Sequence, residues 1–217
     1  YHRPKLETLT NRDGIDFKWK VDTCSSFPCL DSFARATKVT RSSTLPFSKQ
    51  ERYTYFDQST DWVLGQLATT QVGATLITQA TYNTGSALMS TFSAFGQLQQ
   101  SLTYYGDGNV QTVTDALTRT TTLSNWKRGV PQTIAFHDGT SVSATVNDFG
   151  WITSTVNELG SGYTTSYGHD VMGRITSVTH PGADTVAWNT TSIAYDKVAS
   201  AEWGIPANHW RRRETTD

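Results

Sequence analysis

A pattern of seven residues recurs along this chain, and it constrains the fold more than any other feature of the sequence. It consists of an aromatic or aliphatic residue, a small polar residue (often Asp), two variable residues, Gly, a polar residue (often Arg) and an apolar residue. Its clearest copy spans residues 169–175 and contains Asp170, Gly173 and Arg174. Less regular copies, in two of which Thr or Ala replaces Gly, span residues 30–36, 92–98, 104–110, 114–120 and 146–152 and supply Gly96, Gly108, Asp115 and Gly150.

Each position of this pattern has a physical role in a tight turn. The side chain of Asp or Asn accepts hydrogen bonds from the backbone one or two residues later and so favours a turn. Gly provides the positive φ that such turns require. The residues on either side begin and end strands, so each copy predicts the corner of a hairpin. Because a single hairpin cannot bury its apolar side, the repeated corners predict stacked antiparallel hairpins.

The composition and the periodicity also indicate an all-β chain. Thr occurs 36 times in 217 residues, and its β-branched side chain suits a pleated strand. Apolar and polar residues alternate over 98–102 and 142–146 and, less regularly, over 152–156. Asp138-Gly139 between two such runs is typical of a two-residue hairpin. A helix is arguable only over 87–95, where the small polar residues weaken it.

Charge and hydropathy exclude several classes of protein. The net charge is −1, and the run Arg211-Arg212-Arg213 is the one basic cluster, so we expect no nucleic-acid partner. No apolar run is long enough to span a bilayer. The chain begins with Tyr1 and shows no secretory signal, which favours a segment cut from a longer protein.

Cys24 and Cys29 are the two cysteines, and they flank a turn-like stretch. Free thiols are the favoured interpretation, and a small disulfide loop stays open as an alternative. Metal binding is disfavoured because no nearby His completes a set of four ligands.

No arrangement of residues typical of catalysis is recognisable in the sequence. The five histidines show no metal-ligand spacing, and many of the acidic residues are accounted for by turns. A phosphate-binding loop, a nucleophile elbow and a Ser/His/Asp signature are all lacking. We therefore expect no enzymatic activity, no cofactor and no metal.

Seven tryptophans raise the question of a carbohydrate site. Trp62, Trp151 and Trp188 are the candidates for stacking on a sugar, with the Thr-, Asn- and Gln-rich surfaces as hydrogen-bond partners. Packing within the sheet is the favoured interpretation for these rings.

The pattern at 169–175 resembles the YD repeat of the Rhs family, whose ideal form is Tyr-Asp-x-x-Gly-Arg-Leu. Residues 52–57 with 61–67, and residues 204–212, are similar to segments common in bacterial YD-repeat proteins, so the resemblance covers about residues 30–213. It implies a curved, shell-like β-sheet that performs no chemistry itself. It also implies a secreted or cell-surface bacterial toxin, with flanking repeats and a C-terminal toxin domain as partners.

The leading hypothesis is therefore a scaffold: residues 1–217 form one YD-repeat segment of an encapsulating shell. The alternative is a β module that binds carbohydrate or a cell surface. Because an open sheet presents unpaired edge strands, we also expect edge-to-edge self-association.

Overall fold

The computed structural model describes residues 5–182 and 189–216, and the fold in these ranges is all-β. The one helical element described is a single 3₁₀ turn, η1 (Ser161–Tyr163). Seventeen strands belong to one antiparallel sheet, and β3 and β4 form a separate two-stranded ribbon. The strands are β1 (Glu7–Arg12), β2 (Ile15–Val21), β3 (Thr23–Cys24), β4 (Phe27–Pro28), β5 (Lys38–Ser43), β6 (Ser48–Gln58), β7 (Val63–Val72), β8 (Thr75–Tyr82), β9 (Met89–Ala94), β10 (Gln97–Tyr104), β11 (Val110–Asp115), β12 (Thr120–Lys127), β13 (Val130–Ala135), β14 (Ser141–Val146), β15 (Ile152–Val156), β16 (Thr164–His169), β17 (Ile175–Thr179), β18 (Thr191–Lys197) and β19 (Trp210–Thr216).

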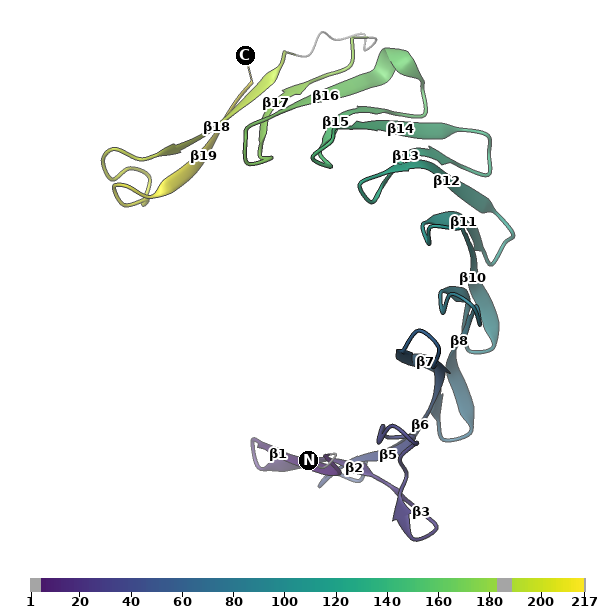
Figure 1. Cartoon of the computed structure of the whole chain (residues 1–217). Coiled ribbons are helices and arrows are strands. Elements are labelled where there is room, and N and C mark those ends of the chain that lie inside the picture. Colours follow the sequence, from purple (N-terminus) through teal and green to yellow (C-terminus); the bar gives the residue numbers. More distant parts are fainter. Residues whose placement is uncertain (1–4, 183–188, 217) are drawn as a thin grey trace. The chain divides into compact units, whose positions relative to one another are not determined.

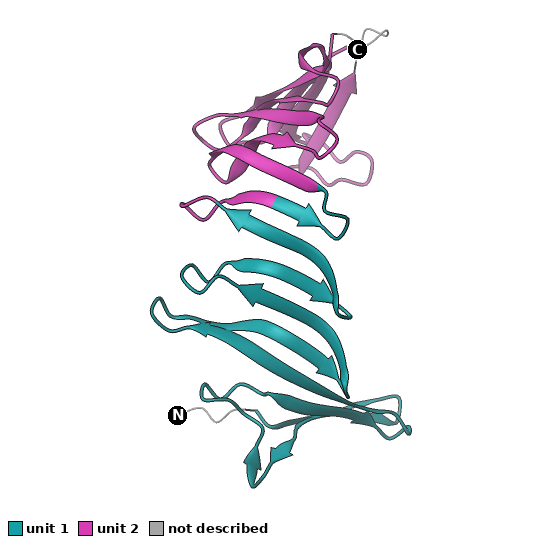
Figure 2. Ribbon diagram, turned by 90° about the vertical axis from the view of Figure 1, so that its right-hand side faces the viewer, with its two compact units in different colours: residues 1–104, 113–119 teal, residues 105–112, 120–217 magenta. Residues whose placement is uncertain are grey.

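The predicted architecture of consecutive antiparallel hairpins is confirmed (Figure 1). The chain divides into two compact units, shown in Figure 2. Unit 1 comprises Tyr1–Tyr104 and Val113–Arg119, and unit 2 comprises Tyr105–Thr112 and Thr120–Asp217. In unit 1 the pairing runs β1–β2–β5–β6–β7–β8–β9–β10, and in unit 2 it runs β12 through β19 in chain order. The arguable helix over 87–95 is strand β9.

In an antiparallel meander the turns alternate between two edges of the sheet, because successive strands run in opposite directions. In unit 2 the turns 128–129, 147–151 and 170–174 therefore lie along one edge, which we call the linked edge. The turns 136–140 and 157–163 lie along the opposite edge. Turns on the same edge are two strands apart, about 10 Å, so long side chains can reach from one to the next.

Each unit buries few residues, because a single layer of sheet has no second layer to cover its faces. The ten residues that are buried within the described ranges are Val21, Cys29, Val39, Glu51, Gln58, Ala87, Val146, Thr191, Ile193 and Val198. One apolar cluster, in unit 1, joins Val21, Cys29 and Val39, and the half-buried Trp19 and Tyr53 pack against it. Most other strand residues are half-buried, so the strands are held mainly by their ladders and cross-strand pairs.

Hydroxyl pairs explain part of the high threonine content. Thr54 on β6 and Thr69 on β7 are opposite each other, and their Oγ1 atoms lie 2.7 Å apart. Thr81 on β8 and Thr91 on β9 repeat the arrangement, with Oγ1 atoms 2.5 Å apart. Threonine thus combines strand propensity with a polar cross-strand contact on a solvent-exposed surface.

The preference for free thiols was wrong: Cys24 and Cys29 form a disulfide. Cys24 ends strand β3 of the β3–β4 ribbon, where it is opposite Phe27, and Cys29 directly follows strand β4. This pairing brings the two Cα atoms to 5.0 Å, within the range that a disulfide spans. The turn-like stretch between the cysteines was the available sequence signal for the disulfide. The sequence does not reveal that strands β3 and β4, on either side of that stretch, pair with each other.

Glu51 is the most connected buried carboxylate of unit 1, with 7% of its surface exposed. It accepts hydrogen bonds from Arg41 Nε at 2.8 Å and Tyr53 Oη at 2.5 Å, and Lys49 Nζ lies 2.7 Å away. Burial alone would raise the pKa of Glu51. The bonds from Arg41, Lys49 and Tyr53 outweigh burial and lower the pKa to about 2, from its ordinary 4.5.

Glu51→Gln is expected to lower the free energy of unfolding at pH 7 by about 1–3 kcal/mol, because hydrogen bonds to a charged acceptor are weakened. The pKa of the folded state lies below the ordinary value. The stabilisation is therefore complete above pH 4.5 and is lost as pH falls toward 2. Urea unfolding at several pH values measures the difference. Glu7→Gln is the matched control, because Glu7 is an exposed carboxylate that forms an ion pair with Lys18 on the surface. A difference at pH 7 that persists unchanged at pH 2 would contradict the role of the carboxylate.

Candidate functional site

The turn at 170–174 shows how the seven-residue pattern folds. The Oδ1 atom of Asp170 accepts the backbone N–H groups of Met172 at 2.9 Å and Arg174 at 3.0 Å, and its Oδ2 accepts Arg174 Nε at 2.7 Å. The backbone closes the same loop, with Gly173 N–H donating to the Asp170 carbonyl at 3.0 Å. One carboxylate therefore fixes both the backbone of the turn and the arginine that follows it.

The same geometry recurs in other copies of the pattern. Asp31 binds the N–H groups of Phe33 and Arg35 and the Arg35 side chain, and Asp115 binds Leu117 and Arg119 in the same way. For Asp170, burial would raise the pKa, but the bonds from Arg174 and Met172 outweigh it and lower the pKa. These carboxylates are thus held as ionised acceptors, the opposite of what a general acid requires.

Glycine in these turns has a second role besides its positive φ. Gly173 has a φ of 81°, and a Cβ atom added there would lie 2.7 Å from Cε2 of Trp151, inside the ring's van der Waals surface. Trp151 follows the preceding turn on the linked edge. The contact repeats one turn earlier, where Arg128 Cβ would lie 3.2 Å from a Cβ atom at Gly150. In unit 1, Arg35 Nη1 would lie 3.1 Å from one at Gly65. In each case a side chain from one turn lies over a glycine in the next turn on the same edge, or, for Gly65, in the strand that follows that turn.

Arginine makes a second kind of contact, with an aromatic ring on a strand further along the chain. The guanidinium carbon of Arg174 lies 4.4 Å from the ring centre of Tyr195 and 5.7 Å from that of Trp210. In unit 1, Arg35 lies 4.4 Å from the ring centre of Tyr55. Each arginine therefore joins the aspartate of its own turn to an aromatic residue further along the chain.

Arg35 makes the most complete of these links. Besides Asp31, it binds both carboxylate oxygens of Asp57, with Nη–Oδ distances of 2.7 and 2.6 Å. Asp57 in turn accepts the N–H of Gly65 at 2.8 Å, so the link reaches the next hairpin. The hydrogen bonds from Arg35 and Gly65 lower the pKa of Asp57. We did not predict this pair; the Phe56-Asp57 dipeptide, which resembles the first two positions of the pattern, was the available signal.

Trp151 is engaged by protein rings. Its ring centre lies 5.0 Å from that of Phe149 and 5.5 Å from that of His169. Trp62 differs, because 75% of its surface is exposed and it has a positive φ of 54° in unit 1. The structure places these two candidate sugar-stacking residues in different units, and Trp188 lies outside the described residues.

The remaining turn residues fall at other corners. Gly96 (φ 74°) lies between β9 and β10, and Asp115 lies at the end of β11. Gly108 (φ 87°) and Gly150 (φ 89°) belong to the turns 105–109 and 147–151. Asp170, Gly173 and Arg174 share one turn, so the structure brings together the members of the clearest copy and separates the others.

This arrangement is suited to joining hairpins. Within the described ranges no group of three His, Cys, Asp or Glu side chains is placed to hold a metal. No helix in the same part of the chain is long and apolar enough to cross a membrane. The aspartates of the repeated turns are occupied by backbone N–H groups and arginine.

Comparison with known families identifies the class of repeat. Residues 146–185 match the family model described as RHS Repeat. This region covers 40 of the 217 residues and includes the turns 147–151 and 170–174. The resemblance to Rhs proteins predicted from these turns is confirmed there. A search of curated proteins returned no match.

Solved structures show the same fold over nearly the whole chain. A crystal structure of TcdB2-TccC3-Cdc42 matches with a TM-score of 0.60 and 12% identity, over 97% of this chain and 13% of that chain. TcdB2-TccC3 without its hypervariable C-terminal region matches with a TM-score of 0.60 and 10% identity, over 92% of this chain and 11% of that chain. A structure of the Photorhabdus luminescens Tc holotoxin pore matches with a TM-score of 0.53 and 12% identity, over 93% of this chain and 10% of that chain. The chain therefore spans a small part of these proteins and is similar to them in fold.

Gly173→Ala is expected to destabilise the protein because the new methyl group meets both the positive φ and the Trp151 ring. Gly139→Ala is the matched control: Gly139 also has a positive φ, of 86°, but nothing lies within 4 Å of its added Cβ atom. The control should lose about 1–2 kcal/mol from the backbone conformation alone. Gly173→Ala should lose a further ~1–3 kcal/mol from overpacking. Urea unfolding measures both, and equal losses would show that the ring contact does not matter.

Arg174→Lys is expected to destabilise the linked edge by about 1 kcal/mol, because lysine keeps the charge but cannot stack a planar group on Tyr195. Arg119→Lys is the control: Arg119 clasps Asp115 as Arg174 clasps Asp170, and its described side-chain contacts include no aromatic ring. Thermal unfolding of the two variants gives the comparison. A larger loss for Arg119→Lys would refute the stacking contribution.

Proposed function

We propose that this chain is a structural segment of the β-sheet shell of a bacterial Rhs-type toxin and has no catalytic role of its own. The observation that carries the proposal is the series of contacts between successive hairpins, typified by Trp151 over Gly173 and Arg174 over Tyr195. Such contacts fix one hairpin against the next and extend a sheet without a second layer. The match of residues 146–185 to the RHS repeat and the fold shared with TcdB2-TccC3 support this function.

The partners of such a segment are further repeats and an enclosed toxin region. Among the described strands, β1 pairs with β2 alone and β19 pairs with β18 alone, so each has a side open to another strand. Flanking repeats would pair there, and without them we expect edge-to-edge self-association. The matched Tc structures, one of which lacks a hypervariable C-terminal region, support a C-terminal toxin partner and a secreted or cell-surface location. The two compact units would then be parts of one continuous repeat segment, residues 1–217.

Protease protection in the longer parent protein tests the shell function. Limited proteolysis is expected to spare the C-terminal region while the repeats are folded and to degrade it after denaturation. Gly173→Ala in the parent protein should increase the rate at which the C-terminal region is cleaved more than Gly139→Ala does, because the first change disturbs the link between turns. Equal cleavage of the C-terminal region with and without the repeat segment would refute the proposal.

The exposed indole of Trp62 favours a second function, carbohydrate binding. If this function holds, titration with glycans should change the Trp fluorescence of the chain, and Trp62→Ala should remove that change. Absence of a response across a glycan panel would leave the shell as the function supported by the structure.

A further inference from the structure

The disulfide joins residues in very different surroundings. Cys24 is exposed on the β3–β4 ribbon, whereas 2% of Cys29 is exposed, and it packs with Val21 and Val39 in the apolar cluster of unit 1. Phe27, between the two cysteines, is exposed as well. The bridge therefore connects an exposed residue to a buried one, and it ties the ribbon to the apolar cluster of unit 1.

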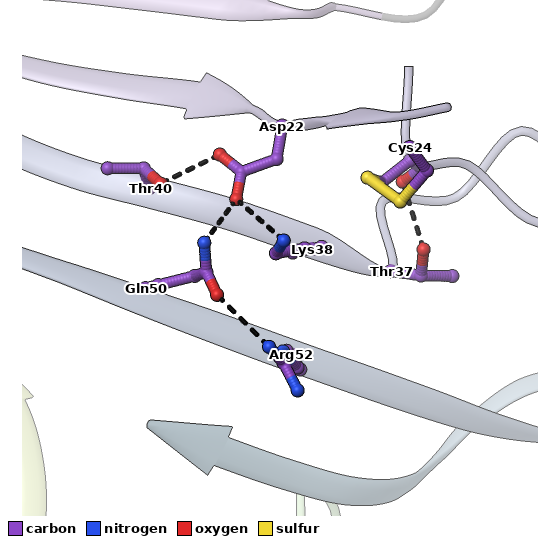
Figure 3. Close-up of a disulfide and its surroundings, with 8 residues drawn as sticks. Asp22, Cys24, Thr37, Lys38, Thr40, Gln50 and Arg52 are labelled. Atoms are coloured by element: carbon purple, nitrogen blue, oxygen red, sulfur yellow. Dashed lines mark hydrogen bonds and ion pairs between the residues drawn. A yellow bond between two sulfur atoms is a disulfide. The ribbon is translucent and has the colours of Figure 1, made fainter. Parts of the chain in front are cut away.

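Backbone bonds carry this constraint into the loop that follows. Cys29 N–H donates to the Asp22 carbonyl at 2.8 Å, and the Cys29 carbonyl accepts Thr37 N–H at 2.8 Å and Thr37 Oγ1 at 3.1 Å. Figure 3 shows Thr37 beside the bridge and the Asp22 carboxylate directed at Gln50 and Thr40 on the neighbouring strands. The first and last residues of the loop 29–37 are thus bonded to each other, and the disulfide attaches to the first of them, Cys29.

This loop carries the most complete link between hairpins in unit 1. It contains Asp31 and Arg35, and Arg35 reaches out of the loop to both carboxylate oxygens of Asp57. The guanidinium can form this bidentate pair only while the loop holds its position. Cys29 is the most buried residue of the loop 29–37. Leu30 and Ala36 also pack against the apolar cluster, but they are half-buried.

We propose that the Cys24–Cys29 bridge is a thiol-sensitive latch that holds the Arg35–Asp57 link closed. A thiolate of a dithiol reductant attacks the Cys24 sulfur, the S–S bond breaks, and Cys29 leaves as a thiolate that takes up a proton. The second thiolate of the reductant then attacks the reductant's other sulfur atom, which is bonded to Cys24 in the mixed disulfide. This step releases Cys24 as a thiolate, which also takes up a proton. The protein gains two electrons and two protons, and the dithiol becomes a disulfide.

The latch responds to its compartment. In an oxidising compartment the bridge is closed and the loop is fixed, and in a thiol-rich compartment the loop is released while the sheet ladders on either side remain. The residues of the latch all belong to unit 1, so the latch does not depend on the shell function.

Hydrogen exchange with and without dithiothreitol tests the latch in the full chain. After reduction, the amides of 29–37 and the Gly65 amide are expected to exchange about 40-fold faster, the factor that loss of a six-residue disulfide loop predicts for local opening. The amides of the β12–β13 hairpin serve as the internal reference and should not change. Unchanged exchange over 29–37 after complete reduction would overturn the proposal.

Two variants separate the bridge from the link it holds. Cys24→Ser leaves the Cys29 thiol in the cluster, so it should reproduce the fast exchange and make the chain insensitive to dithiothreitol. Asp57→Asn keeps the bridge intact, so it should raise exchange at Gly65 while that of the Cys29 amide stays slow. In the reduced chain, iodoacetamide should label Cys24 before Cys29. Fast exchange in the wild-type chain that dithiothreitol does not increase, or equal labelling of the two thiols, would contradict the latch.

Discussion

The contact between a side chain from one turn and a glycine in or beside the next turn on the same edge is the constraint on which this structure depends. A single-layer sheet cannot be stabilised by a buried core, and this one buries few residues. Its hairpins need another source of specific order. Trp151 over Gly173 supplies it in unit 2, and Arg35 over Gly65 supplies it in unit 1. The glycine is required twice, once for its φ and once for the absence of a side chain.

The interactions that could be predicted from the sequence are the local ones. The partners of Asp170 all lie within four residues, so the chemistry of Asp, Gly and Arg in one short pattern was enough to predict the turn. Threonine content indicated an all-β chain, and alternation predicted strands that correspond to β10, β14 and β15. The all-β hairpin architecture follows from these two kinds of information, because the described pairings of its sheet other than β2–β5 join consecutive strands.

The contacts that were missed join residues about twenty positions apart. Arg35 and Asp57 are separated by 22 positions, and their pairing depends on which edge each turn occupies. The seven-residue pattern does not encode the edge, since Gly96 and Asp115 fit it from turns other than the linked ones. The spacing of 23 positions between Asn147 and Asp170 was the clue, because it equals two strands and two turns. The disulfide was missed for a related reason, since the pairing of β3 with β4 is not visible in the composition around Cys24.

The two edges of unit 2 differ in how they would tolerate change of length. On the linked edge an inserted residue would move Trp151 away from Gly173, so the lengths of the turns 147–151 and 170–174 are fixed by contacts outside them. Among the residues that the structure describes, no hydrogen bond, ion pair or aromatic pair joins the turn 136–140 to the segment 157–163 on the opposite edge. That edge is where chain length can vary between related sequences, and where a peptide tag or an additional loop could be inserted without disturbing the register of the sheet.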